Sequence, residues 1–98
     1  MLSANLTKEM RKAVYKRDGY RCALCDNPAG LQIHHYVSRG QGGINHPMNL
    51  ITLCWNCHAI IHGTRLAGYD FMGQDDLIQA CAEYLGDYYA PDWYPYEG

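Results

Sequence analysis

Four of the five cysteines form two C-x-x-C pairs, Cys22 with Cys25 and Cys54 with Cys57. Four thiolates are the number and type of ligand that a tetrahedral structural Zn²⁺ takes in proteins. Two redox motifs would each need a thioredoxin-like context, which is absent here, and iron–sulfur clusters usually have other cysteine spacings. The pairs therefore predict one structural zinc. The fifth cysteine, Cys81, falls on an apolar helical face, which favours a core position over a ligand.

All five histidines lie in one stretch of thirty residues, IHHYVSRGQGGINHPMNLITLCWNCHAIIH. His58 and His62 are four residues apart on an expected helix, so they point from one face and can share a metal. His34 and His35 are adjacent on an expected strand and must point to opposite sides. One of them could complete a metal site with the helical pair, unless a twist or bulge brings both into the cleft. His46 matches no motif, and an exposed loop residue without a role is favoured over a DNA contact.

The elements that must position these side chains follow from periodicity and turn signals. Thr7 caps an N-terminal basic helix over about 7–17, whose apolar face is Leu6, Met10, Ala13 and Val14. The other expected elements are a strand over 31–37, a flexible glycine-rich loop over 39–43, a strand or turn over 49–53 and a helix over 55–62. A last helix over about 74–86 buries Leu77, Ile78, Cys81 and Leu85, and an irregular aromatic tail runs over 87–98.

The length of 98 residues predicts a single domain, 1–98, in which a core alone gives modest stability. Zinc binding contributes about 10–16 kcal/mol in small zinc modules, comparable with the roughly 5–15 kcal/mol that stabilises a whole domain. We expect a cytoplasmic protein, because the sequence shows neither a signal peptide nor an apolar run near the roughly 20 residues of a membrane span.

The net charge of −2 hides an asymmetry along the chain. Residues 1–65 hold all eight Lys and Arg against three acids, a net +5, and residues 66–98 hold seven acids and no base, a net −7. A basic half is compatible with a phosphate backbone as partner, because Lys and Arg release condensed counterions on binding. Two solvated faces that attract each other explain the charges equally well.

The motifs YRCALC, LQIHHYVSRGQGG and NLITLCWNCHAIIH together resemble the HNH endonucleases that carry a four-cysteine zinc site. The resemblance covers about 11–63. It implies an α+β fold, a small ββα-metal (treble-clef-like) domain that zinc stabilises. The N-terminal helix and, over about 74–98, the C-terminal helix and aromatic tail flank this domain.

The resemblance also implies a role for each motif residue. His34 takes the position of a ligand to the catalytic metal, and His35 that of the general base. Asn49 takes the position of a structural residue that holds the loop between the strands and orients the base. His58 and His62 match metal ligands on the helix, His62 less closely than the others.

Hydrolysis of a phosphodiester by such a site needs an activated water and a cation that neutralises charge at phosphorus. A histidine with a pKa near 6.5 is largely neutral at cell pH and can take the proton of water. Three imidazoles suit Zn²⁺, Ni²⁺ or Mn²⁺ better than Mg²⁺. Mg²⁺ or Mn²⁺ nevertheless commonly serves this family, so the identity of the catalytic cation stays open.

The expected activity is a DNA endonuclease, with nicking by a monomer or double-strand cutting by a dimer. The candidate DNA contacts are Arg39 and Gln41 in the glycine-rich loop and Lys12, Lys16 and Arg17 on the basic helix. The acidic C-terminal third predicts a protein partner that supplies DNA affinity, and small HNH proteins are often phage-encoded and work beside DNA packaging machinery. The alternative is a non-catalytic zinc module that binds nucleic acid or protein. For the tail, packing within the chain or a protein partner is favoured over base stacking.

Overall fold

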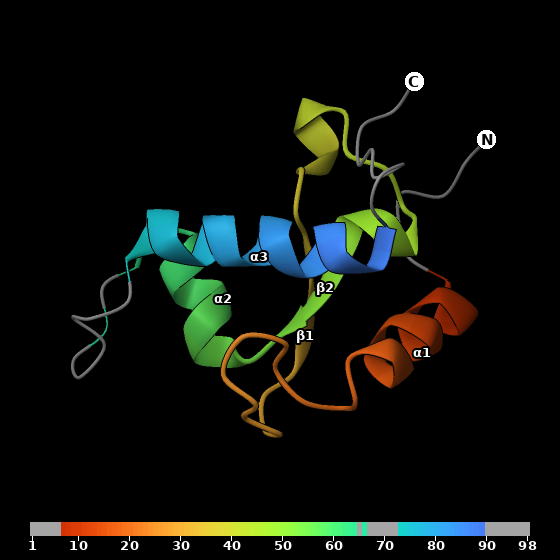
Figure 1. Ribbon diagram of the computed structural model, residues 1–98, viewed down its shortest axis with the longest axis horizontal. Coiled ribbons are helices and arrows are strands. Elements are labelled where there is room, and N and C mark those ends of the chain that lie inside the picture. The colour runs from red at the N-terminus through yellow and green to blue at the C-terminus, as the bar shows by residue number, and fades with distance from the viewer. Residues whose placement is uncertain (1–6, 65, 67–72, 90–98) are drawn as a thin grey trace.

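A two-stranded antiparallel sheet lies at the centre of the computed structural model, with helices on both sides (Figure 1). The structure describes residues 7–64, 66 and 73–89, apart from the side chain of Arg39. Its elements are α1 (Lys8–Arg17), β1 (Gln32–His35), the short 3₁₀ turns η1 (Arg39–Gln41) and η2 (Pro47–Asn49), β2 (Leu50–Leu53), α2 (Trp55–Ile61) and α3 (Gln74–Tyr89). This is the α+β arrangement that the sequence predicts, with the order ββα in its central part.

Helix α1 begins where the sequence predicts, because the Thr7 hydroxyl accepts a hydrogen bond from the Met10 amide at 3.1 Å. Val14 is its one fully buried residue among those described. Met10 is half-buried and Ala13 is exposed, and Leu6 lies outside the described residues. The buried face of α1 is therefore narrower than its apolar periodicity predicts.

The two strands are shorter than predicted, and the buried side chain of Asn49 explains the end of β1. In the paired region, His34 lies opposite Ile51 and His35 opposite Leu50. Beyond it, the Val37 amide donates to Asn49 Oδ1 at 2.8 Å, so a side chain takes the place of a strand partner. All four residues of β2 are buried. One amide side chain thus fixes the hairpin at its loop end.

The glycine-rich loop is a compact turn. The amides of Gln41 and Gly43 both donate to the Ser38 carbonyl, at 3.0 and 2.9 Å. Gly43 is buried, and a Cβ atom there would lie 1.7 Å from the Val37 carbonyl oxygen. Only glycine permits this close approach of two backbones. The loop over 39–43, which the sequence predicted to be flexible, is thus a hydrogen-bonded turn that contains η1.

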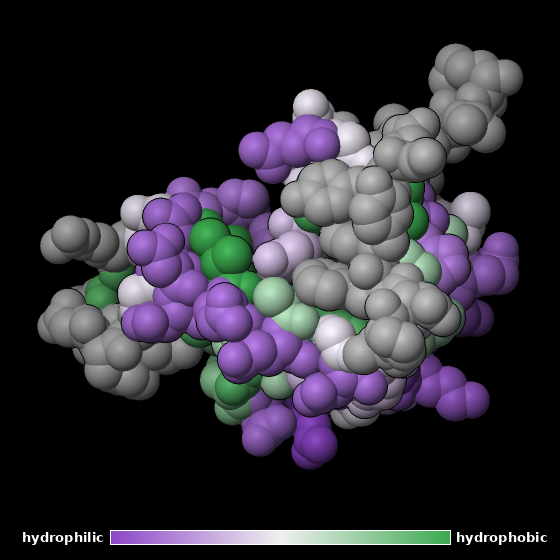
Figure 2. All heavy atoms as spheres, turned by 45° about the horizontal axis from the view of Figure 1, so that its top comes forward, coloured by the Kyte–Doolittle hydropathy of each residue, from purple (hydrophilic) through white to green (hydrophobic). Residues whose placement is uncertain are grey.

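Helix α3 covers α2 and the hairpin, and buries Leu77, Cys81 and Leu85 against Ile51, Ile60 and Ile61 among others. The predicted core position of Cys81 is confirmed. Ile78 was predicted to be buried, and this is wrong: its side chain is 39% exposed because it borders a cleft. The helix also continues to Tyr89, past the predicted end at Gly86. The face seen in Figure 2 is mainly hydrophilic, with small hydrophobic patches.

Arg17 joins α1 to β2 and α3. Its guanidinium pairs with Asp18 in two contacts, of 2.7 and 2.9 Å, and donates to the Pro47 and Leu50 carbonyls at 2.8 and 2.6 Å. Its fifth contact is the Tyr89 hydroxyl at 3.2 Å. Burial alone would lower the pKa of Arg17, but hydrogen bonds and charges of Asp18 and Tyr89 raise it.

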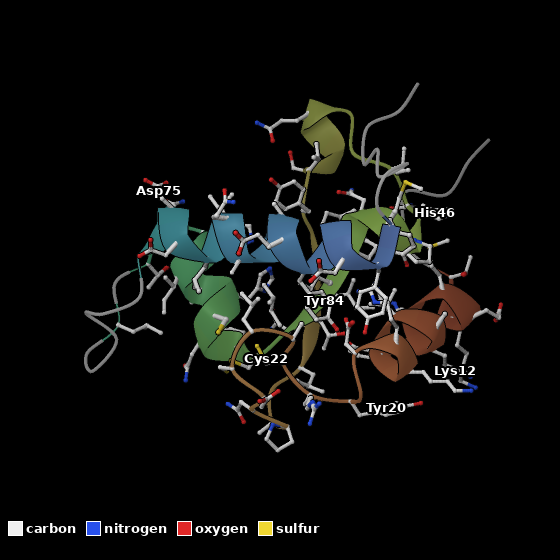
Figure 3. The ribbon with its side chains drawn as sticks, viewed as in Figure 1. Lys12, Tyr20, Cys22, His46, Asp75 and Tyr84 are labelled. Carbon is white, nitrogen blue, oxygen red and sulfur yellow. The ribbon has the colours of Figure 1, made fainter. Side chains whose placement is uncertain are left out.

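The carboxylate of Asp18 completes this network. It is fully buried, and it accepts from the Tyr84 hydroxyl at 2.7 Å and from the Thr52 amide at 2.9 Å. Tyr84 reaches it from α3, between that helix and α1 (Figure 3). The guanidinium also lies 5.4 to 5.9 Å from the ring centres of Tyr84, Tyr88 and Tyr89. Tyr88 and Tyr89 therefore pack within the chain, whereas the rest of the tail, 90–98, lies outside the described residues.

Replacing Arg17 by Met keeps an unbranched stem but leaves the buried Asp18 carboxylate without its ion pair. We expect the free energy of unfolding to fall by about 3–5 kcal/mol, the usual cost of removing one partner of a buried pair. Urea denaturation measures this loss. The matched control is Arg21→Met, because the Arg21–Asp26 pair is exposed, with side chains 60% and 75% accessible. Equal losses in both variants would contradict the assignment.

Candidate functional site

The four paired cysteines converge from two distant parts of the chain. The turn that carries Cys22 and Cys25 is closed by the Asp26 amide, which donates to the Cys22 carbonyl at 2.9 Å. Cys54 caps α2, and its Sγ accepts from the Cys57 amide at 3.5 Å. The loop after α1 and the start of α2 are thereby brought face to face.

The cysteine cluster has the dimensions of a tetrahedral zinc site. The Sγ atoms of Cys25 and Cys54 are 3.6 Å apart, and those of Cys25 and Cys57 are 3.7 Å apart. Four sulfurs bound to Zn²⁺ at about 2.3 Å would lie about 3.8 Å from one another, whereas a disulfide needs about 2.05 Å. A hydrogen bond from the Cys57 thiol lowers the pKa of Cys22 to about 4, and burial raises that of Cys25 to about 11. The cluster fits a structural zinc held by thiolates.

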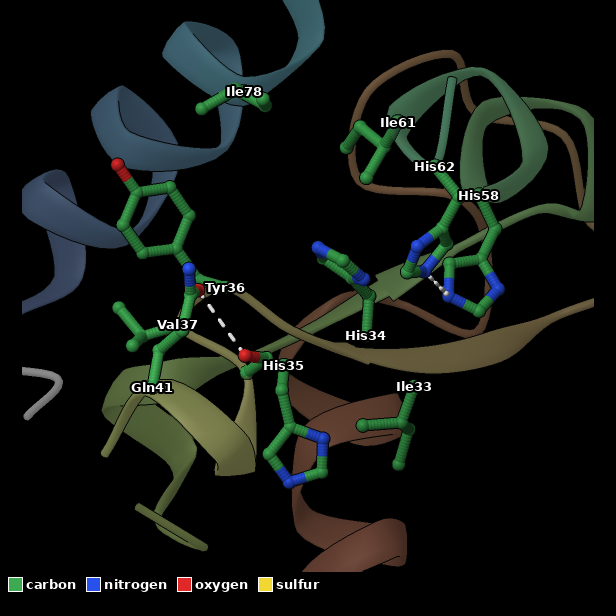
Figure 4. A pocket seen from close by; sticks show the side chains of 11 residues that line it. Ile33, His34, His35, Tyr36, Val37, Gln41, His58, Ile61, His62 and Ile78 are labelled. Atoms are coloured by element: carbon green, nitrogen blue, oxygen red, sulfur yellow. Dashed lines mark hydrogen bonds between the residues drawn. The ribbon is translucent and has the colours of Figure 1, made fainter. Parts of the chain in front are cut away.

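A second cluster is formed by His34 of β1 with His58 and His62 of α2. Their rings meet edge to face, with centroids 4.7 to 5.3 Å apart (Figure 4). The Nε2 atoms of His58 and His62 are 3.0 Å apart, and one nitrogen from each of the three rings lies within 4.8 Å of the others. Two nitrogens bound to one tetrahedral Zn²⁺ at about 2.0–2.1 Å would be about 3.3 Å apart. The three rings therefore fit a single divalent cation.

The environment of this histidine cluster favours neutral imidazoles. Burial, together with the charges of His58, His62 and His35, lowers the pKa of His34 to about 3. Burial and the charge of His62 also lower the pKa of His58. A neutral ring keeps a lone pair for a metal, so the lowered pKa values of His34 and His58 favour the form that binds a cation. Among the described residues, no carboxylate joins the cluster.

His35 points to the other side of β1 from His34, as adjacent strand residues must (Figure 4). Both nevertheless line one cleft of about 800 Å³, together with His58, His62 and Ile78. The His35 Nε2 donates to Asn45 Oδ1 at 2.8 Å, which leaves Nδ1 free to accept a proton. Both histidines of the pair thus line the same cleft, although their rings point to opposite sides of β1.

Asn49 is fully buried and makes three hydrogen bonds to backbone. Besides accepting from the Val37 amide, its Nδ2 donates to the carbonyls of Val37 and Ile44, at 2.9 and 3.0 Å. It lies away from the histidine rings and acts on the loop between the strands. These contacts hold the loop in place, and those to Val37 lie two residues after His35 in the chain.

Two amide side chains that sequence reasoning missed contact the histidines directly. Gln32 Oε1 accepts a hydrogen bond from His58 Nδ1, and Asn45 Oδ1 accepts the one from His35. The alternation of side chains along a strand could have identified Gln32, since Gln32 and His34 are two residues apart on β1 and share a face. No local pattern marks Asn45, which lies in the loop between η1 and η2.

The candidate DNA contacts differ in their surroundings. Lys12 and Lys16 are exposed on α1, and Lys12 points outward in Figure 3. Arg17 faces inward and its donors are already used. Gln41 lines the cleft, exposed, with its Oε1 accepting from the Ser38 hydroxyl at 3.1 Å. The side chain of Arg39 lies outside the described part.

His46 has a local role that its sequence context did not indicate. Its Nδ1 accepts from the Met48 amide at 3.1 Å and caps η2. The ring is exposed, and this contact explains its conformation without a ligand.

A two-stranded sheet, a following helix, a four-cysteine cluster and a histidine cluster define a ββα-metal zinc domain. The family model described as HNH endonuclease matches residues 22–64, which contain both clusters. Residues 22–64 are therefore similar to the HNH endonuclease family. No curated protein matches the chain. In the described part, no helix is both long and apolar enough to cross a membrane.

Substituting Cys25 by Ser removes one ligand of the cysteine cluster, and we expect zinc content to fall from about one ion per chain to near zero. Cooperative folding should be lost with it, because the free energy of zinc binding is part of the free energy of folding. Zinc content and near-ultraviolet circular dichroism measure both effects. Cys81→Ala is the control, since Cys81 is buried outside the cluster, and it should retain the zinc. A folded Cys25→Ser protein would refute the structural role.

Exchanging Asn49 for Asp replaces the donating Nδ2 by an oxygen that faces two carbonyls. Each buried group left unpaired costs about 1–3 kcal/mol, so we expect a loss of a few kcal/mol in unfolding free energy. Thermal and urea unfolding check this. In the control Asn27→Asp, the oxygen that accepts from the Ala29 amide at 3.0 Å is retained, and stability should change little. If both variants are equally stable, Asn49 does not hold the loop.

Proposed function

We propose that this chain is a metal-dependent DNA endonuclease or nickase. Its active site is the cleft that the histidine cluster and His35 line. The observation that carries the proposal is the arrangement of His34, His58 and His62 around one point, with His35 lining the same cleft. The family match supplies the reaction class, phosphodiester hydrolysis. In this proposal residues 1–98 act as one domain, because α3 packs on the α2 helix that carries two of the histidines.

His35 is the general base of the proposed reaction. Its Nδ1 takes a proton from the attacking water, while the Nε2–H group keeps donating its hydrogen bond to Asn45 Oδ1. The Asn45 oxygen then stabilises the imidazolium that forms and fixes the ring during the transfer. Water adds to phosphorus, the bond to the 3′ oxygen breaks, and this oxygen takes a proton from solvent, so that the strand ends in a 5′-phosphate and a 3′-hydroxyl. Proton transfer of this kind contributes about 10²–10⁴-fold in rate.

His34, His58 and His62 would hold the catalytic divalent cation in this proposal. When bound, such a cation supplies Lewis-acid neutralisation of the phosphate and the departing oxygen. Three imidazole ligands suit Zn²⁺, Ni²⁺ or Mn²⁺, and Mg²⁺ would need added oxygen ligands from phosphate and water. The four cysteines hold the structural zinc separately.

The exposed charges suggest how DNA is held. Helix α1 presents Lys8, Arg11, Lys12 and Lys16, which supply the phosphate contacts of the proposal together with Gln41 at the cleft. Helix α3 presents Asp75, Asp76, Glu83 and Asp87, which repel a phosphate backbone. We therefore include a protein partner, such as the packaging machinery of a phage that encodes the enzyme, to supply further DNA affinity. A single chain would nick, and a dimer could cut both strands.

Incubation of the zinc-loaded protein with supercoiled plasmid and added Mg²⁺, Mn²⁺, Ni²⁺ or Zn²⁺ tests this function. We expect metal-dependent conversion to open circles. His35→Ala should reduce the nicking rate at least about 100-fold through loss of the base, with its structural zinc retained.

The control for loss of an imidazole is His46→Ala, because His46 caps η2 and is absent from the cleft lining. It should nick at close to the wild-type rate. Absence of nicking by folded, zinc-loaded wild type with every cation would refute the isolated chain as a nuclease and leave a zinc-binding module.

A further inference from the structure

Gln32 contacts the His58 ring of the histidine cluster at Nδ1, the ring nitrogen other than the one that faces His62. It opens β1, its side chain is half-buried, and its Oε1 accepts a hydrogen bond from His58 Nδ1. His58 faces His62 with its other ring nitrogen, Nε2. The two nitrogens of one imidazole therefore have different partners, an amide oxygen on one side and the cluster on the other.

An amide oxygen can only accept a hydrogen bond, and this decides the protonation of the neutral His58 ring. Its proton resides on Nδ1, and the lone pair resides on Nε2, directed at the cluster. In the other tautomer, two lone pairs would face each other at Gln32, and an N–H would point to the place where a cation would bind. The contact thus selects the tautomer and the ring orientation that a metal requires.

We propose that Gln32 is a positioning residue for the catalytic cation, acting through His58. This inference rests on the proposed function, since it concerns the same histidine cluster. Hydrogen bonds to the far nitrogen of a metal-bound histidine fix its orientation and increase its basicity, and their loss typically costs 10–100-fold in metal affinity. The conformation of β1 is preorganised for the task, because Gln32 and His34 share one face of the strand.

The test compares Gln32→Met, which keeps the side-chain length without an acceptor, with Gln32→Glu, which keeps an acceptor. Zinc-loaded proteins are titrated with Ni²⁺ by calorimetry, and zinc content is measured before and after. We expect Gln32→Met to bind Ni²⁺ 10–100-fold more weakly, and Gln32→Glu to bind at least as tightly as wild type. A role in packing alone would favour the apolar Met over the charged Glu in this half-buried position.

The matched control is Gln79→Met, because Gln79 is exposed on α3, outside the histidine cluster, and its side chain donates to Glu83 at 3.3 Å. It should bind Ni²⁺ as wild type does. His34→Ala gives the baseline for Ni²⁺ bound outside the cluster. The nitrogen chemical shifts of the His58 ring in the metal-free protein give a second readout: Nδ1–H in wild type and Gln32→Glu, and a tautomer mixture in Gln32→Met.

Unchanged Ni²⁺ affinity and tautomer in Gln32→Met would overturn the inference and leave the nuclease proposal standing. Reduced nicking with unchanged affinity would overturn it too, since Gln32 would then act on substrate. If wild type binds no more Ni²⁺ than His34→Ala, the metal centre and the inference are both wrong. Weaker binding confined to Gln32→Met, with its structural zinc retained, is the supporting result.

Discussion

The position of α2 is the constraint on which the site depends, and the cysteine cluster fixes it. Cys54 caps the helix and Cys57 lies in its first turns, so the four sulfurs determine where α2 begins and how it is rotated. His58 is the next residue, and His62 follows one turn later. A small core of this size could not hold a seven-residue helix so firmly by apolar contacts alone.

The hairpin supplies the other half of the site through a backbone that tolerates little change. Asn49 binds the backbone of Val37 and Ile44, and Gly43 lies against the Val37 carbonyl, where any side chain would collide. These contacts fix the strand ends around His34 and His35. Because neighbouring strand residues face opposite sides, one histidine joins the metal cluster and the other is held by Asn45. The roles that we propose for the two histidines, as metal ligand and as general base, are consistent with this strand geometry.

The buried polar network that joins the helices and β2 is made of other residues than those that line the histidine cleft. Arg17, Asp18 and Tyr84 tie α1, β2 and α3 together on the side away from the histidine cluster, with nearly every polar atom paired. This use removes Arg17 from the basic surface of α1, where Lys12 and Lys16 remain exposed. In the proposed function, the acidic face of α3 would limit how DNA approaches. The protein thus presents positive charge on one helix and negative charge on another.

The sequence by itself predicted the order of the elements, the four-cysteine cluster and the pairing of His58 with His62, because C-x-x-C pairs and an H-x₃-H helix are local patterns with fixed geometry. The adjacent strand histidines left open which of the two joins that pair. It also placed Cys81 in the core from helical periodicity. The tertiary structure alone decided that Ile78 borders the cleft, that Arg17 turns inward, and that Gln32 and Asn45 hold the histidines. Those outcomes depend on which elements pack together, and hydrogen bonds between distant residues leave no periodic trace in the chain.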